Sequence, residues 1–163
     1  MTSEQQSPAP ERDLSISPPP LKRVLYTAEA VVEGGRNGHG RTGDGRLDVD
    51  FSVPAAMSGD DGPGTNPEQL FAVGYAACFQ SALLAVAQGR NIDASGSQIA
   101  SRVGIGPRSA GGFGIQVWLD LRDRSIPAEE ARELMLRADQ RCPYSNATRG
   151  NVAVALSVNG QPV

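Results

Sequence analysis

The stretch TNPEQLFAVGYAACFQSALLAVAQG, residues 65–89, is the longest apolar run of the chain and decides the fold. Thr65 or Asn66 can cap a helix, Pro67 suits its first position, and Gly89 can end it. Polar residues between these ends are few, which is typical of a helix enclosed on all sides. We therefore expect a long, buried, central helix. Glutamine and serine interruptions argue against a membrane span, so no membrane association is expected.

Length and composition place limits on the class of protein. The chain has 163 residues, which fits one domain with a real core, and a net charge of -3 with 20% charged residues. The balance of charge is not basic, so nucleic-acid binding is not expected. Two cysteines do not make a disulfide scaffold. Because we find no secretory signal pattern, we expect a reducing cytoplasm, where a cysteine pair is more often catalytic or redox-active than structural.

The first 20 residues differ in composition from the rest. They contain five prolines and few aliphatic side chains, too little apolar surface to offset the entropy of ordering them. We expect residues 1–20 to be a disordered tail, with a proline-rich ligand for a protein partner as the alternative. Residues 21–163 are expected to form a single domain.

Two stretches before the central helix have the pattern of strands. Residues 22–33 alternate loosely and residues 46–53 strictly between apolar and polar side chains, which predicts an antiparallel pair. The linking residues 34–45 are half glycine, which indicates a mobile or tightly turned segment. This segment carries Arg36, His39 and Arg41 on what we expect to be a flexible arm. It contains no phosphate-binding motif, so nucleotide binding is not expected.

The remainder alternates between strand and helix patterns. Strands are predicted at 99–106, 113–121 and 151–158, and an amphipathic helix opens at Pro127 and runs to Cys142. Pro143 disfavours continuing the same helix. The order of strands, helix, strands, helix and strand predicts an α+β fold.

The two cysteines, Cys78 and Cys142, are the candidate reactive groups. A thiol attacks as the thiolate, and a mid-helix position denies Cys78 the dipole of a helix N-terminus. Its activation therefore requires a cation, such as an arginine held by a carboxylate. Taken alone, Cys78 also fits a small core residue. Cys142 lies at the inward-facing end of the second expected helix, so the pair fits a peroxidatic and a resolving thiol, with a structural disulfide as the alternative.

Three segments carry a family resemblance: GGRNG at 34–38, TNPEQLFAVGYAACF at 65–79 and CPYSNATRGN at 142–151. They resemble the organic hydroperoxide resistance (Ohr) family within the wider Ohr/OsmC superfamily, from about Leu25 to the C-terminus. The resemblance implies an α+β fold with antiparallel strands, a long buried central helix, a second helix and an intertwined homodimer. It implies no bound cofactor or metal.

The resemblance also implies roles for four residues. Cys78 would be the peroxidatic thiol and Cys142 the resolving thiol, joined by a Cys78–Cys142 disulfide during turnover. Arg36 would stabilise the thiolate and orient the peroxide, with Glu68 as its carboxylate partner. The implied reaction reduces organic hydroperoxides to alcohols, and the implied electron donor is a dihydrolipoyl group, free or on a lipoylated protein.

Spacing along the central helix makes a geometric prediction. Glu68 and Cys78 are ten residues apart, which on one helix is roughly 15 Å of rise. They can hardly share a site within one chain, so we expect the site to be completed across a two-fold interface. We expect apolar pocket walls that favour alkyl or lipid hydroperoxides, formed by Phe71, Tyr75, Phe79 and Met57. Tyr144 and Thr148 are candidates for positioning the segment around Cys142.

Two other classes of function remain open from the residues. A non-enzymatic redox sensor or hydrophobic-ligand carrier would use the same pocket and cysteines without turnover. A cysteine hydrolase would have to recruit His39, the only histidine. With one histidine and two distant cysteines, the chain has no zinc-binding spacing.

Overall fold

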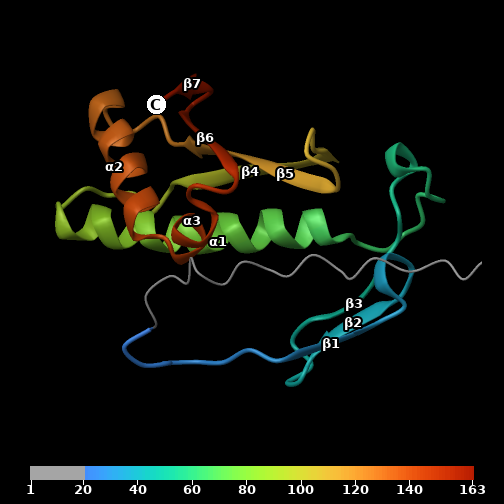
Figure 1. Ribbon diagram of the computed structural model, residues 1–163. Coiled ribbons are helices and arrows are strands. Elements are labelled where there is room, and N and C mark those ends of the chain that lie inside the picture. Colours follow the sequence, from blue (N-terminus) through green and yellow to red (C-terminus); the bar gives the residue numbers. More distant parts are fainter. Residues whose placement is uncertain (1–20) are drawn as a thin grey trace, which may run out of the picture.

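The computed structural model describes residues 21–163, which form two β-sheets and three α-helices (Figure 1). The proline-rich segment 1–20, predicted to be disordered, lies outside the described residues. A three-stranded sheet stands below the N-terminal end of helix α1, and the larger sheet with the other helices lies above it (Figure 1). The predicted α+β class is confirmed.

The small sheet contains a strand that the sequence pattern did not indicate. Strands β1 (Ala30–Glu33), β2 (His39–Thr42) and β3 (Asp48–Asp50) are ordered β1-β2-β3, and β2 pairs antiparallel with both neighbours. The predicted direct pairing of the first and third of these strands is therefore wrong. The sequence of β2, HGRT, lacks apolar alternation, so its strand is defined by the backbone ladders on its two sides.

The residues between the small sheet and α1 form a short connection. It includes a 3-10 turn, η2, at Ala55–Met57. Phe51 bridges to Thr65, and the Ser52 N–H donates to the Thr65 carbonyl at 2.9 Å. The connection therefore returns to the end of β3 just before α1 begins.

Helix α1, Pro67–Gly89, has the predicted bounds. The Asn66 side chain caps it by accepting a hydrogen bond from the Gln69 N–H at 2.9 Å, and Pro67 occupies the first turn. By length and composition alone α1 could cross a bilayer, but a core helix of a soluble protein passes the same test, and α1 packs against β4 and α2.

The prediction that α1 is enclosed on all sides is wrong for the single chain. One face, with Tyr75, Phe79 and Leu83, is fully buried, whereas Val73 is 70% exposed and Leu84 is 39% exposed on other faces. The reason is that the large sheet, α2 and α3 cover only part of the helix circumference. An apolar side of α1 is left open to solvent.

The large sheet is ordered β4-β5-β6-β7, with strands at Gln98–Pro107, Phe113–Arg122, Ala153–Val158 and Gln161–Pro162. The β4–β5 hairpin is antiparallel over ten residue pairs, while β5 and β6 are parallel. A parallel pair requires a crossover, which here contains α2 (Ala128–Arg141) and α3 (Pro143–Thr148). The short helix α3, which Pro143 begins, was not predicted.

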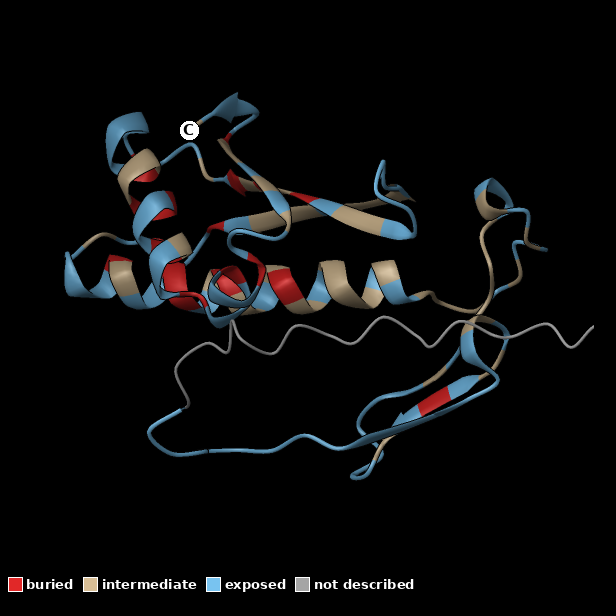
Figure 2. Cartoon of the chain, viewed as in Figure 1, coloured by how far each residue is buried: buried red, intermediate tan, exposed pale blue. Residues whose placement is uncertain are grey.

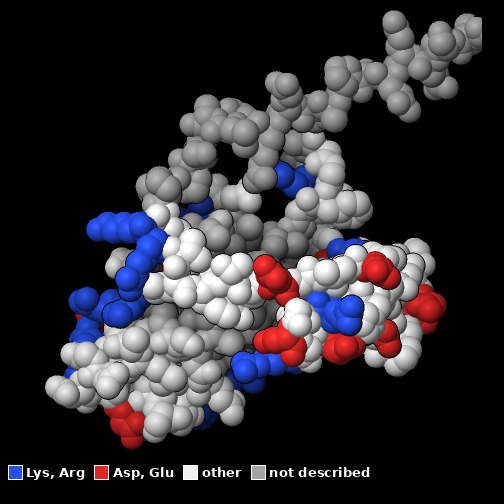
Figure 3. Space-filling view, turned by 90° about the horizontal axis from the view of Figure 1, so that it is seen from below, with Lys and Arg blue, Asp and Glu red and all other residues white. Residues whose placement is uncertain are grey.

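The core lies where α1, α2 and β5 meet. Alternate residues of β5, Val117, Leu119 and Leu121, point into it, and Figure 2 shows buried positions concentrated on these elements. The small sheet is largely exposed, with Gly40 its single buried position among the described strands. On the face drawn in Figure 3, charged side chains of both signs surround a broad uncharged area. The large sheet and helices α1 to α3 thus share a buried core, whereas the small sheet has no core of its own.

Two leucines of α2 give a direct test of this core assignment. Leu134 is fully buried and Leu136 is 50% exposed. We expect Leu134→Ala to lower the free energy of unfolding by about 2 to 5 kcal/mol, because it leaves a cavity. Leu136→Ala should cost about 0.5 kcal/mol or less. Urea denaturation at one fixed protein concentration measures both, and equal losses would contradict the assigned core.

Candidate active site

Arg36 projects from a tight glycine turn between β1 and β2. Gly34 and Gly35 have φ values of 71° and 58°, and residues Gly35–Asn37 form a 3-10 turn, η1. A Cβ on Gly38 would lie 1.7 Å from the Glu33 carbonyl oxygen, so only glycine fits there. Of the two alternatives predicted for residues 34–45, a mobile or a tightly turned segment, the structure shows a tight turn at residues 34–38. Arg36 has a defined turn beneath it, and His39 lies in strand β2.

Arg36 and Glu68 form a two-pronged ion pair within the chain. Arg36 Nη1 donates to Glu68 Oε2 at 2.8 Å, and Nη2 donates to Oε1 at 2.6 Å. Glu68 lies in the first turn of α1, and its side chain is largely buried beside the guanidinium. The hydrogen bond from Arg36 lowers the pKa of Glu68, so its carboxylate stays ionised at neutral pH. The structure thus brings together the two residues that the family resemblance paired.

The two cysteines also lie together, although Cys78 is in α1 and Cys142 lies between α2 and α3, 64 positions later. Both are free thiols, and their Sγ atoms are 3.4 Å apart. Cys142 is fully buried at the junction of α2 and α3, while Cys78 is partly exposed. A small movement would bring the two sulfur atoms to bonding distance.

The surroundings of Cys78 within one chain disfavour its thiolate. Burial is the main cause that raises the pKa of Cys78 above its usual value, and the neighbouring Cys142 thiol raises it further. The backbone N–H of Tyr144 acts in the opposite direction. Among the described residues, no arginine or lysine contributes to this pKa. The single chain therefore holds a protonated thiol that lacks a cation.

The ion pair and the cysteine pair are separate features of one chain. Helix α1 is continuous from Glu68 to Cys78, so about 15 Å of helix rise separates the two residues. The structure places Arg36 with Glu68, and Cys78 with Cys142, but it does not bring these two pairs together within a chain.

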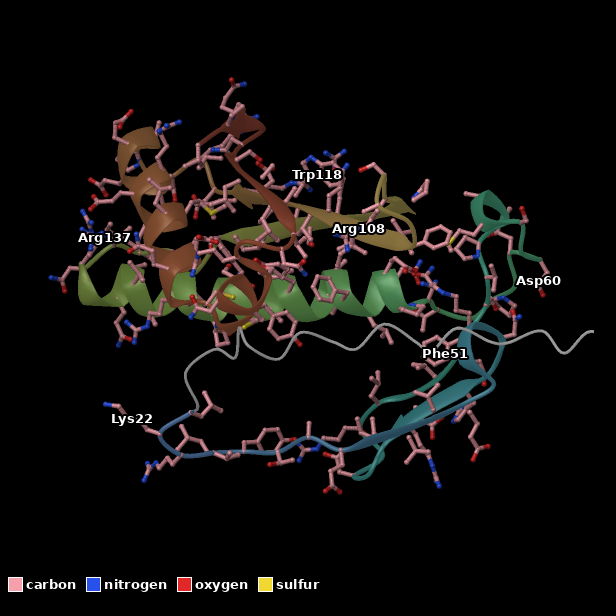
Figure 4. All side chains as sticks on the ribbon, in the orientation of Figure 1. Lys22, Phe51, Asp60, Arg108, Trp118 and Arg137 are labelled. Atoms are coloured by element: carbon pink, nitrogen blue, oxygen red, sulfur yellow. The ribbon has the colours of Figure 1, made fainter. Side chains whose placement is uncertain are left out.

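An open pocket of about 510 Å³ lies beside the ion pair. Its lining is mostly apolar, and Phe51 lies on it between the small sheet and the N-terminal end of α1 (Figure 4). The lining residues are Val32, Gly35, Arg36, Phe51, Pro67, Leu70, Phe71 and Tyr144. A larger hollow, of about 700 Å³, lies at the β4–β5 tip and includes neither cysteine nor Arg36.

Of the four predicted pocket walls, only Phe71 lines this pocket. Tyr75 and Phe79 are fully buried because they project from the inner face of α1 into the core, so their assignment as pocket walls is wrong for the single chain. Met57 lies in η2 and does not line the pocket either. Tyr144 does line it, and its place beside Cys142 in the CPYS segment was the available signal.

The buried ring of Tyr75 has a different set of contacts. Its hydroxyl lies 2.9 Å from Ser145 Oγ and 3.1 Å from Thr148 Oγ1, both on α3. The Tyr144 ring packs against Tyr75 and Phe71 at centroid distances of 5.7 and 6.0 Å. An aromatic and hydroxyl cluster therefore fastens α3 to α1.

Other chemistries find little support in the described residues. The His39 ring nitrogens lie 2.8 Å from Asp50 Oδ1 and 3.1 Å from Asp48 Oδ1. These carboxylates raise the pKa of His39 and occupy both of its nitrogens, which does not suit a hydrolase base. No cluster of three potential metal ligands occurs among residues 21–163.

Comparison with known proteins gives a consistent family. Residues 59–157 match the OsmC-like protein family. The chain is 48% identical over 138 residues to the organic hydroperoxide resistance protein of Xanthomonas axonopodis pv. citri, covering 84% of this chain and 96% of that one. It is 47% identical to the organic hydroperoxide resistance protein OhrB of Bacillus subtilis, covering 83% of this chain and 98% of that protein.

Solved structures agree with these sequence relationships. A putative organic hydroperoxide resistance protein from Vibrio cholerae, with captopril bound in one of its active sites, superposes with a TM-score of 0.82 at 44% identity, covering 87% of this chain and 97% of that one. An organic hydroperoxide resistance protein from Legionella pneumophila gives a TM-score of 0.79 at 45% identity, covering 83% and 98%. The chain belongs to the OsmC-like family and, within it, to the organic hydroperoxide resistance proteins.

Proposed function

We propose that the protein is a cysteine-based peroxidase that reduces organic hydroperoxides to alcohols and protects a cytoplasm against organic peroxide stress. The single observation that carries the proposal is the 3.4 Å approach of two free thiols, Cys78 and Cys142. The names of the relatives, which state organic hydroperoxide resistance, support the same class of substrate.

The reaction divides into three balanced steps. The Cys78 thiolate attacks the distal peroxide oxygen, an S–O bond forms as the O–O bond breaks, and the alkoxide takes up a proton to leave as the alcohol. The Cys142 thiol then attacks the Cys78 sulfenic acid, which forms the disulfide and releases water. A dithiol reduces this disulfide and is itself oxidised to a disulfide.

We infer that each site uses Arg36 and Glu68 of one subunit and Cys78 of the other in a homodimer. Three features support this arrangement. Helix α1 keeps Glu68 far from Cys78 of its own chain, and the Cys78 pKa is raised with no Arg or Lys of residues 21–163 lowering it. A third is the exposed apolar surface that a second copy would cover. It includes Val73 and Leu84 on α1 and Leu25 and Tyr26 before β1.

In this arrangement Arg36 supplies what Cys78 lacks. Its guanidinium would lower the pKa of the partner's thiol and donate to the peroxide, and it would stabilise the alkoxide as the O–O bond breaks. Glu68 holds the Arg36 guanidinium with two hydrogen bonds, so the Arg36 side chain loses little further conformational entropy when the substrate binds.

The pocket favours substrates with an apolar substituent. Phe51, Leu70 and Phe71 present apolar surface beside Arg36, which suits an alkyl or lipid chain and gives hydrogen peroxide nothing to bury. We propose that no bound cofactor is needed and that the electron donor is a dihydrolipoyl group, free or on a lipoylated protein.

Single cysteine substitutions test the assigned roles. We expect Cys78→Ser to abolish consumption of cumene hydroperoxide. Cys142→Ser should consume one equivalent and leave a sulfenic acid on Cys78, because attack needs only the first thiol. A peroxide assay with mass spectrometry of a dimedone adduct measures both.

The wild-type protein with dihydrolipoamide provides the reference, and it should turn over repeatedly. Oxidation of Cys142 before Cys78 would reverse the roles. A single stoichiometric oxidation of the wild type in the presence of dithiol would instead identify a redox sensor.

Substitution of Arg36 tests the source of thiolate stabilisation. We expect Arg36→Ala to raise the pKa of Cys78 and to slow attack on hydroperoxide by about 10²-fold, the typical effect of removing one transition-state donor. Arg36→Lys should recover part of the pKa effect but not the two-pronged contact with Glu68. Titration of thiolate absorbance near 240 nm in a Cys142→Ser background reports the Cys78 pKa.

Arg41→Ala is the matched control, because it removes the same charge from β2, which follows the Arg36 turn. Arg41 forms no ion pair within residues 21–163. An unchanged Cys78 titration in Arg36→Ala, or an equal change in Arg41→Ala, would remove Arg36 from the mechanism.

A further inference from the structure

Helix α3 is the short element that adjoins the second thiol. It spans only six residues, Pro143–Thr148, and directly follows Cys142. A helix of this length is not stable by itself in water. Contacts with the rest of the protein must therefore hold it in place.

The hydroxyl of Tyr75 provides a buried polar contact between α1 and α3. It meets Ser145 and Thr148, residues 70 and 73 positions later, at 2.9 and 3.1 Å. Tyr75, Ser145 and Thr148 are all buried. A buried hydroxyl that loses its partner carries a desolvation cost, so this contact specifies one docking position for α3.

The directions of these hydrogen bonds follow from the remaining partners. Thr148 Oγ1 donates to the Tyr144 carbonyl at 2.9 Å, so its only proton is already used. Tyr75 must then donate to Thr148, which leaves Ser145 to donate to the Tyr75 oxygen. The result is a continuous chain from Ser145 through Tyr75 and Thr148 to the backbone of α3.

Backbone hydrogen bonds connect Cys142 to both α2 and α3. The Cys142 N–H donates to Ala138 at the end of α2, and its carbonyl accepts from the Asn146 N–H in α3 at 3.0 Å. Cys142 is thus the junction of the two helices. Tyr75 precedes Cys78 by three residues, about one helical turn, so it ties α3 to the part of α1 that carries the first thiol.

We propose that Tyr75 is a positioning residue for the resolving step, an inference that rests on the proposed peroxidase function. In that step the Cys142 sulfur bonds to the Cys78 sulfur, the S–O bond of the sulfenic acid breaks, and hydroxide leaves with the Cys142 proton as water. The reaction joins two groups already held 3.4 Å apart, so its rate depends on their placement, and a 1 Å error can cost about 10²-fold.

The proposal separates two steps that use the same cysteine. Attack on hydroperoxide requires the Cys78 thiolate and a cation, and α3 contributes to it only through Tyr144, whose backbone N–H lowers the pKa of Cys78 and whose ring lines the pocket. We therefore expect loss of the Tyr75 hydroxyl to slow attack far less than resolution. Resolution requires Cys142 in place. When resolution slows, the sulfenic acid persists and a second hydroperoxide can oxidise it to the sulfinic acid.

Tyr75→Phe tests this directly, since it removes one oxygen and leaves the packed ring. In single-turnover experiments on the full chain with cumene hydroperoxide, we expect sulfenic acid formation within about twofold of wild type and disulfide formation slowed by about tenfold or more. At excess hydroperoxide, mass spectrometry should show more sulfinic acid on Cys78 than in wild type.

Two further variants keep the test specific. Ser145→Ala removes another hydroxyl of the same hydrogen-bond network. Because both substitutions break one network, the resolution rate of the Tyr75→Phe/Ser145→Ala double variant should fall by less than the product of the two single effects. Ser157→Ala removes a hydroxyl that donates to Asp120 Oδ1 at 2.6 Å in the large sheet. It should leave the resolution rate unchanged at a comparable loss of stability.

Disulfide formation driven by diamide separates this proposal from the peroxidase function. Diamide accepts a thiolate at its N=N bond, and the second thiol then displaces it as the hydrazine, so the step needs Cys142 placement but no peroxide. Slow disulfide formation in Tyr75→Phe with diamide supports the positioning role even if wild type fails to reduce hydroperoxide. Equal slowing of attack and resolution, or a resolution rate like that of Ser157→Ala, would overturn it.

Discussion

A continuous α-helix keeps Glu68 and Cys78 of one chain apart, by roughly 15 Å of rise. The carboxylate lies in the first turn, where it grips Arg36 through two hydrogen bonds. The thiol lies in the middle, where burial raises its pKa and no cation in the described part of the chain offsets the effect. A peroxidatic thiol needs that cation, so the rigidity of α1 leads to the proposal that two chains complete one site.

The same helix organises the cysteine half of the site. Its inner face supplies core side chains, and one of these, Tyr75, carries a hydroxyl that docks α3. We propose that docking of α3 helps to hold Cys142 beside Cys78, where the two sulfur atoms are 3.4 Å apart. Helix α1 therefore carries three residues of the site: Glu68 binds Arg36, and in our proposals Tyr75 positions Cys142 and Cys78 attacks the peroxide. Because one rigid element holds all three residues, their relative positions do not depend on loop conformation.

The sequence predicted some parts of this structure well, for physical reasons. The Asn66 cap, Pro67 and Gly89 indicated the ends of α1, and the alternation in residues 113–121 indicated β5. Strand β2 was missed because HGRT has no apolar alternation and is defined by its neighbours. Helix α3 was missed because six residues carry no periodic signal. Tyr75 and Phe79 were misassigned because an almost uniformly apolar helix does not reveal which face meets the core. Pairing of Arg36 with Glu68 came from family resemblance, since their separation in sequence gives no local signal.

A mixed dimer tests the two-subunit site most directly. One chain carries Cys78→Ser and the other Arg36→Ala, with different affinity tags so that the heterodimer can be purified. If each site combines Arg36 of one chain with Cys78 of the other, one site is fully wild type and the other lacks both groups, so the heterodimer should show about half of wild-type peroxidase activity. Each homodimer should be nearly inactive. Activity of the heterodimer no higher than that of the Arg36→Ala homodimer would show that Arg36 acts on Cys78 of its own chain and would contradict the account.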